Sequence, residues 1–241
     1  MVVALAVAMG AFAKSVTGLG LPLVAIPVIA SFLGVETAVV VMALPTVVTN
    51  VWMLWEHRAS ASQTRELPVL LTTGTVGVVV GTAILRVADP RWLALALAMV
   101  IFGYLALRLA RPGLALRASI TTQLSPFAGG LAGLAQGATG ISGPVVSTYL
   151  HAFRLPAGAF LFSTNAMFLV FALVQVVAFI ATGLYQGRVA PSLLALLPVA
   201  LVFPAGLAVG RRMDVERFDR ALLALLFLSG LKQVSDALGV T

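Results

Sequence analysis

Long stretches without a charged residue restrict the fold of this chain more than any other feature. Residues 37–55, 159–184 and 190–210 contain none. Each is long enough to cross a bilayer as a helix, which takes about 20 apolar residues. Only 10% of all residues are charged, whereas a soluble domain carries about 25%. We therefore predict a polytopic membrane protein, and a water-soluble enzyme or a disordered chain is excluded.

The excess of basic residues fits this class. The net charge of +7 would suggest a nucleic-acid partner in a soluble protein. In a membrane protein, Lys and Arg gather in cytoplasmic loops instead, so we expect the lipid bilayer and no nucleic acid as partner. The chain has no cysteine, which excludes disulfides and cysteine–metal sites. No HExxH, GxSxG or Walker A motif occurs, so we expect no enzyme, no metal and no cofactor.

The apolar segments occur twice in the same order. Each set has two shorter pieces followed by three longer ones, at 1–13, 21–33, 37–55, 67–87 and 92–108, and again at 125–138, 141–153, 159–184, 190–210 and 221–240. Lengths near 20 residues favour helices over membrane strands. We predict an all-α fold with a first repeat at 1–112, a basic cytoplasmic linker at 113–124 and a second repeat at 125–241.

Short motifs support the duplication. The segment Thr17-Gly18-Leu19-Gly20-Leu21-Pro22 aligns with Thr139-Gly140-Ile141-Ser142-Gly143-Pro144. Thr49-Asn50 aligns with Thr164-Asn165 in the first long segment of each set. The pattern Gly77-x-x-x-Gly81 has a counterpart in Gly206-x-x-x-Gly210.

Arginine positions indicate how the repeats are oriented. If each pair of shorter pieces returns to the side from which it entered, ten arginines fall in the cytoplasm: Arg58, Arg65, Arg108, Arg111, Arg117, Arg154, Arg211, Arg212, Arg217 and Arg220. Three fall outside: Arg86, Arg91 and Arg188. If each pair of shorter pieces instead crosses the membrane once, the excess of arginines on the cytoplasmic side disappears. The positive-inside rule favours the first arrangement. We therefore predict inverted repeats, each with a broken or re-entrant pair of short helices and three full transmembrane helices, and both termini outside the cytoplasm.

The glycine-rich junctions are the candidate binding site. A helix that ends inside the membrane exposes backbone groups, which is tolerable where they line a cavity or meet a ligand. The half-helices that begin near 21–24 and 143–146 would point positive dipole ends inward and bind an anion. The alternative is that these glycines only pack helices together. The candidate substrate-binding residues here are Thr17, Gly18, Gly20, Pro22, Thr139, Gly140, Ser142, Gly143 and Pro144.

Polar residues on the first long segment of each repeat extend this candidate site. Asn50 and Asn165 are the leading candidates for substrate contact, followed by Thr49 and Thr164. Their alternative role is hydrogen bonding between helices.

Three further residues are candidates for anion attraction or coupling. Lys14 lies next to a break and either attracts an anion or extends to an interface; its repeat partner Gln136 is neutral. His151 either carries a proton or forms an interfacial hydrogen bond. No Asp or Glu lies in the middle of the long segments apart from Asp236 in the last one, which favours an anionic substrate.

The two glycine-rich segments resemble those of a known family. Gly10-x7-Gly18-x-Gly20-x-Pro22 and Gly133-x3-Gly137-x2-Gly140-x-Ser142-Gly143-Pro144 are similar to segments of the sulfite exporter TauE/SafE family of membrane permeases. The resemblance covers essentially the whole chain. It implies transport of sulfite, an organosulfonate or another small organic acid across the bacterial inner membrane, with both termini then in the periplasm.

We therefore expect a secondary transporter that moves a small anion by alternating access around the paired breaks. Protons are a candidate coupling ion, and a homo-oligomer is compatible with the sequence. A passive anion channel of the same fold and a membrane scaffold that transports nothing are the alternatives.

Overall fold

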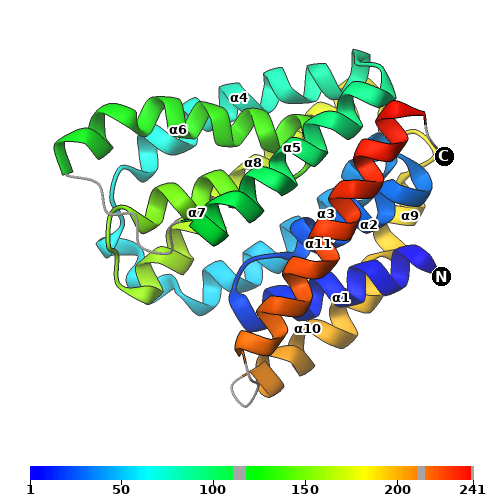
Figure 1. Cartoon of the computed structure of the whole chain (residues 1–241). Coiled ribbons are helices and arrows are strands. Elements are labelled where there is room, and N and C mark those ends of the chain that lie inside the picture. The colour runs from blue at the N-terminus through cyan, green and yellow to red at the C-terminus, as the bar shows by residue number, and fades with distance from the viewer. Residues whose placement is uncertain (111–117, 211–214, 240–241) are drawn as a thin grey trace.

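The computed structural model describes residues 1–110, 118–210 and 215–239, and all regular structure in these ranges is helical (Figure 1). The helices are α1 (Val2–Thr17), α2 (Leu21–Leu33), α3 (Val35–Glu56), η1 (Arg58–Gln63), α4 (Leu67–Val87), α5 (Pro90–Ala110), α6 (Ala118–Thr139), α7 (Gly143–His151), α8 (Ala157–Thr182), α9 (Val189–Leu194), α10 (Leu196–Gly210) and α11 (Val215–Leu238). Among the described residues, six segments are long and apolar enough to cross a membrane: α3, α4, α5, α8, α9 with α10, and α11. The chain is an all-α polytopic membrane protein.

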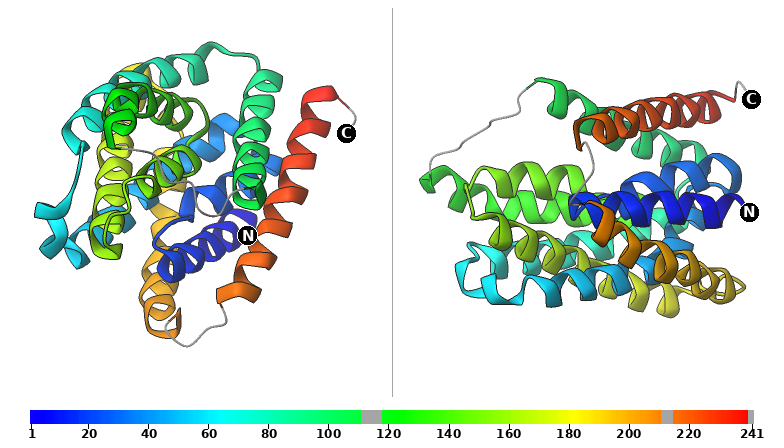
Figure 2. Two further views of the ribbon diagram at one scale, coloured as in Figure 1. Left: turned by 60° about the vertical axis from the view of Figure 1, so that its left-hand side comes forward. Right: turned by 90° about the horizontal axis from the view of Figure 1, so that it is seen from below.

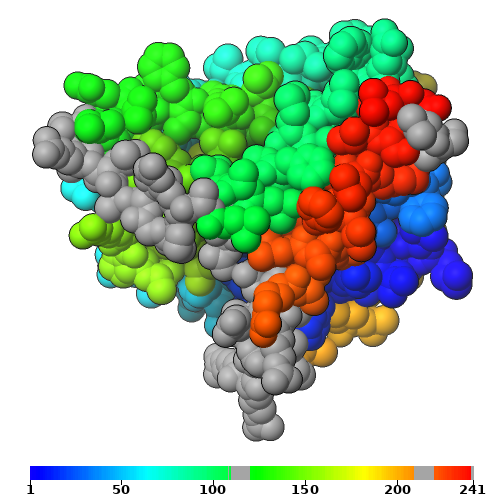
Figure 3. Space-filling view, in the orientation of Figure 1, coloured from blue at the N-terminus to red at the C-terminus, as the bar shows by residue number. Residues whose placement is uncertain are grey.

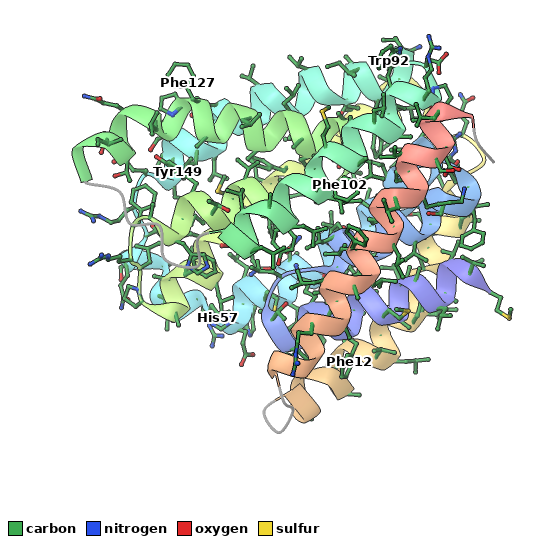
Figure 4. The ribbon with its side chains drawn as sticks, viewed as in Figure 1. Phe12, His57, Trp92, Phe102, Phe127 and Tyr149 are labelled. Atoms are coloured by element: carbon green, nitrogen blue, oxygen red, sulfur yellow. The ribbon has the colours of Figure 1, made fainter. Side chains whose placement is uncertain are left out.

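The distribution of exposed and buried side chains is that of a protein surrounded by lipid. Large apolar side chains are exposed on the outer helix faces, as at Ile180 and Leu201, which are 67% and 76% exposed. Phe127 likewise projects outward from α6 (Figure 4). Polar side chains are inside the molecule, and the fully buried ones include Thr49 and Asn50. Lipid solvates apolar surface and cannot hydrogen-bond to polar groups, which accounts for this distribution.

Helix bounds lie within about four residues of the predicted segments, except that α11 begins at Val215 instead of 221 and that two segments differ as follows. The helices α2 and α4 have the predicted limits 21–33 and 67–87. The predicted piece 125–138 is part of a longer helix, α6, because its polar first turns find partners: Thr122 Oγ1 donates to Glu66 Oε1 at 3.1 Å, and Ser125 Oγ lies 2.8 Å from Tyr149 Oη. Residues 118–124, expected in the linker, are therefore helical.

The second difference is that the segment 190–210 consists of two helices, α9 and α10, which meet at Ala195. The other half has one uninterrupted helix, α4, in the corresponding place of the element order.

Both broken pairs return to the end of the molecule at which they begin. Helix α1 starts beside the chain terminus marked N, and α2 runs back to that end; α6 and α7 start and finish at the opposite end (Figures 1 and 2). The start of α1 and the end of α11 lie at the same end (Figure 2). An ion pair of 2.7 Å between Arg188 and Glu36 is also at this end. This path is compatible with inverted repeats, which stay a prediction.

The charged residues also divide between the two ends. Ser60 of η1 lies against Gly158 at the start of α8, so Arg58 and Arg154 belong to one end. His57 and Trp92 are at opposite ends (Figure 4). Of the arginines counted above, Arg111, Arg117, Arg211 and Arg212 lie outside the described residues, as do residues 113–117 of the linker and the side chains of Arg108 and Arg217.

Buried apolar residues form two separate clusters. The larger, which we call the first body, joins α1, α2, most of α3, α5 and α9–α11, together with Leu85 at the end of α4 and Phe179 near the end of α8. The smaller, the second body, joins parts of α4, α6, α7 and α8, with Leu70, Phe168 and Phe171 among its members. Figure 3 shows α5 and α11 side by side on the surface of the first body. The two glycine-rich breaks connect α1 to α2 and α6 to α7. Each break contacts the other body, since Leu19 packs against the second body and Ile141 belongs to the first.

Helices α4 and α6 are packed backbone against backbone. A methyl group added at Gly77 would collide with the carbonyl oxygen of Gly130, and one added at Gly133 would collide with that of Gly74. Glycines of this kind let membrane helices approach closely, where van der Waals contact replaces the hydrophobic effect. The helix α1 also packs on α10, where a methyl group added at Gly206 would collide with the side chain of Ser15.

A larger side chain at this contact should destabilise the protein. We expect Gly133→Leu to lower the free energy of unfolding by about 1–3 kcal/mol, the usual effect of overpacking. The melting temperature of the purified protein should then fall by about 2–12 °C. Gly103→Leu on α5 is the matched control, because nothing lies within 4 Å of a methyl group added there. Equal melting temperatures for the two variants would contradict the packing described.

Candidate functional site

The first break is closed on its α1 side by a threonine. Thr17 Oγ1 donates to Ala13 O at 2.8 Å and accepts a hydrogen bond from the backbone N–H of Leu19 at 3.1 Å. Gly18 ends α1 with φ 74°, a left-handed conformation that favours glycine. Gly20 then precedes the first residue of α2. The Thr17 hydroxyl is thus bonded within the chain, as is the N–H of Gly18, which donates to Lys14 O at 2.7 Å.

The second break repeats these contacts. Thr139 Oγ1 donates to Ala135 O at 2.8 Å and accepts from the N–H of Ile141 at 3.4 Å. Gly140 has φ 71°, and Ser142 precedes the first residue of α7. The two threonines were predicted to bind substrate. The structure gives both hydroxyls protein partners and places neither in the cavity wall described next.

A cavity of about 50 Å³ lies between the two breaks. Its wall combines residues of both halves: Leu19, Gly20, Pro22, Leu23, Thr46, Tyr104, Gln136, Gly140, Ile141, Ser142, Gly143, Ser147 and Phe168. Six of these were predicted as site residues, namely Gly20, Pro22, Gln136, Gly140, Ser142 and Gly143. The breaks, 122 residues apart in the sequence, therefore face each other across one space.

Two helices begin at this cavity with free backbone donors. The first intrahelical bonds are Val24 N–H to Gly20 O and Val146 N–H to Ser142 O. The N–H groups before them have no partner within the helix, and neither helix has a side-chain cap. Pro22 and Pro144, which lack an N–H, are the second residue of each helix. Because α2 and α7 both present the positive end of a helix dipole here, the cavity favours negative charge.

A polar group that we call the Lys14 cluster adjoins the first break. It consists of Lys14, Gly18, Asn50 and Asn165. Lys14 is fully buried, and its Nζ donates to Asn50 Oδ1. Asn165 Nδ2 donates to Leu161 O at 2.8 Å and to Gly18 O at 3.5 Å. The interfacial alternative for Lys14 therefore does not apply.

The Lys14 cluster is incompletely hydrogen-bonded. Asn50 Nδ2 and Asn165 Oδ1 are buried without a partner, as is Thr164 Oγ1 nearby on α8. The orientation of both amides follows from their neighbours: Asn50 must turn its oxygen to the ammonium, and Asn165 must turn its nitrogen to two carbonyls. Unpartnered buried polar groups are rare and point to an additional ligand or to water.

The Gln136 cluster at the second break is neutral and complete. Ser142 Oγ donates to Gln136 Oε1 at 2.8 Å, and Gln136 Nε2 donates to Gln175 Oε1 at 3.1 Å. Gln175 Nε2 in turn donates to Gln136 O at 3.0 Å. The two breaks therefore share a backbone pattern but differ in charge, with a lysine at one and an amide at the other.

The remaining predicted residues lie outside the cavity wall. Thr49 bonds back to Pro45 O at 2.9 Å within its own helix. His151, at the end of α7, is exposed and stacks on Phe160 with 4.3 Å between ring centroids. The structure thus brings Asn50, Asn165 and Lys14 together and leaves His151 apart from them.

Sequence reasoning missed several wall residues. Thr46 was recognisable, since it lies one turn before Asn50 on the same helix face. Phe168 occupies the repeat position of Met53, at the offset of 115 that relates Asn50 to Asn165. Ser147, one turn into α7, and Tyr104, from the distant helix α5, gave no signal, because only tertiary packing brings them to the breaks.

The family model described as sulfite exporter TauE/SafE matches residues 2–233, nearly the whole chain. Comparison with curated proteins and with solved structures finds no match.

Cysteine labelling can test the cavity, because the chain has no cysteine of its own. We expect Ser147→Cys and Thr46→Cys, in the wall from opposite halves, to react with a small anionic methanethiosulfonate reagent. Thr82→Cys is the control, since Thr82 is buried but does not line the cavity. The readout is the mass of the labelled protein. Labelling of Thr82→Cys at the same rate as the wall positions would contradict the assignment.

Proposed function

Because the chain belongs to the sulfite exporter TauE/SafE family of membrane transporters, we propose that it is a secondary transporter for a small anion. Sulfite and small organosulfonates are the leading substrates, and the anion binds in the cavity between the two breaks. Transport proceeds by alternating access across the bacterial inner membrane, with both chain termini on the periplasmic side.

One observation carries this proposal: two uncapped helix N-termini meet at one cavity whose wall contains no acidic residue. Each N-terminus offers backbone N–H donors and about half a unit of positive charge. In the low dielectric of a membrane interior these donors have no water to satisfy them. An oxyanion provides the missing acceptors, and the neighbouring Lys14 adds a full positive charge.

The size of the cavity agrees with a small substrate. A volume of about 50 Å³ holds roughly three to five water molecules. Sulfite has four non-hydrogen atoms. The hydroxyls of Ser142 and Ser147 and the amide of Gln136 add neutral polar groups to the wall. A methyl or carboxymethyl group on a sulfonate would meet the apolar side, formed by Leu19, Leu23 and Phe168.

The division into two bodies supports alternating access. The cavity lies where α2 of the first body faces α6, α7 and α8 of the second. The bodies do not coincide with the sequence repeats, because α4 of the first repeat is packed on α6 of the second and α1 on α10. Movement of one body against the other would open the cavity to either side and keep these two tight contacts intact, while α3 of the first body slides on α8 of the second, against which it packs.

Reconstitution into proteoliposomes tests the proposal. We expect saturable flux of sulfite or methanesulfonate with counterflow, the stimulation of labelled uptake by unlabelled anion inside. Asn50→Leu removes the acceptor of Lys14, and because a hydrogen bond to a charged group contributes about 1.5–3 kcal/mol, flux should fall about 10- to 150-fold. Asn165→Leu should reduce flux as well, since it frees the carbonyl of Gly18.

Gln233→Leu is the matched control, a buried amide that bonds Ser31 at 3.2 Å between α11 and α2. Its flux should equal that of the unmodified protein. A non-saturating current without counterflow would show a channel instead of a carrier. The absence of flux for every anion tested would favour a scaffold, and unchanged flux in both asparagine variants would remove the Lys14 cluster from the site.

A further inference from the structure

The charge of Lys14 needs an explanation beyond anion attraction. Its ammonium is fully buried, and Asn50 Oδ1, an uncharged acceptor, is its hydrogen-bond partner among the described residues. The ring of Phe168 lies next to it, with 5.6 Å from Nζ to the ring centroid. The same ring lines the cavity, so one aromatic side chain neighbours both Lys14 and the cavity.

Among the side chains that the structure describes, no carboxylate is hydrogen-bonded to or ion-paired with Lys14. The sequences of α2, α6, α8 and α10 contain no titratable residue, and Lys14 is the one such residue in α1. Helix α3 has Glu36 and Glu56, in its first and last turns, whereas Asn50 lies between them. Helix α7 has Tyr149 and His151 at its far end, and α5 brings the neutral phenol of Tyr104 to the cavity.

A buried ammonium without a countercharge is costly, whereas a neutral amine is not. An anion in the cavity supplies the missing countercharge. Anion binding therefore favours protonation of Lys14, and protonation of Lys14 favours anion binding by the same factor, because linkage is reciprocal.

We propose that Lys14 takes up a proton when the anion binds, so that the transporter moves one proton together with each anion. This inference rests on the proposed function of the cavity. The proton adds to the lone pair of Lys14 Nζ, and no bond to the anion forms or breaks. On release the ammonium returns the proton to water on the side where the anion leaves.

The stoichiometry follows from the difference between the breaks. Gln136, at the repeat position of Lys14, cannot titrate, and its cluster is fully hydrogen-bonded. One transport cycle thus carries one proton, and movement of a monovalent anion with it is electroneutral. Proton and anion move in the same direction. The sum of the proton gradient and the anion gradient across the membrane determines which direction this is.

Calorimetry of the purified, full-length protein tests the linkage directly. Methanesulfonate and sulfoacetate are the probes, because they stay ionised from pH 6 to 9 and any proton taken up must go to the protein. Titrations in two buffers of different ionisation enthalpy give the number of protons bound. We expect about one proton per anion, and an affinity that falls about tenfold per pH unit once Lys14 is mostly neutral in the empty protein.

Binding without proton uptake would overturn the proposal and leave the proposed function standing. Absence of binding by every anion, sulfite included, would overturn both.

The variant Lys14→Gln tests whether Lys14 is the residue that takes up the proton. It places at position 14 the residue type found at the repeat position, Gln136. We expect this variant to bind methanesulfonate without proton uptake, and its flux in proteoliposomes to ignore an imposed pH gradient. Lys232→Gln is the control, because Lys232 is partly exposed and paired with Asp236; it should keep one proton per anion. Proton uptake by Lys14→Gln equal to that of the unmodified protein would contradict the assignment. If Lys14→Gln does not fold, the number of protons that the unmodified protein takes up per anion still tests the proposal.

Discussion

A helix that ends inside a membrane must satisfy its backbone without water, and this constraint shapes the centre of the molecule. At the ends of α1 and α6, Thr17 and Thr139 each donate to the carbonyl four residues earlier. The two beginnings that face the cavity, at α2 and α7, are left uncapped. Free N–H donors are therefore gathered at one place, where an anion would supply the missing acceptors.

Close packing holds these breaks in position. Because glycines bring α4 and α6 into backbone contact, the α6 side of the second break is fixed to a helix of the other half. The α1 side of the first break is fixed to α10 through Gly206. Asn165 of α8 reaches across to Gly18. Each break thus depends on elements of both halves, which places the cavity at the interface between the two bodies and makes their relative motion a means of opening it.

Most of the fold could be predicted from the sequence, because lipid leaves few alternatives for apolar runs bounded by glycine and charge. The limits of α2 and α4 follow from such boundaries. The first turns of α6 could not be predicted, since Thr122 and Ser125 become acceptable in a helix only beside Glu66 and Tyr149. In the site, the duplicated motif identified the backbone of both breaks. It could not reveal the burial of Lys14 beside Asn50, or that Phe168 both neighbours this lysine and lines the cavity.

The central claim is that an anion binds between the first turns of α2 and α7. Selenite in place of sulfite tests it most directly, because selenium scatters X-rays anomalously and its position can be read from crystals of the protein. We predict one anomalous peak between Gly20 and Gly143, within hydrogen-bonding reach of the free backbone N–H groups. A peak at any other place, or none at a selenite concentration that saturates transport, would contradict the claim.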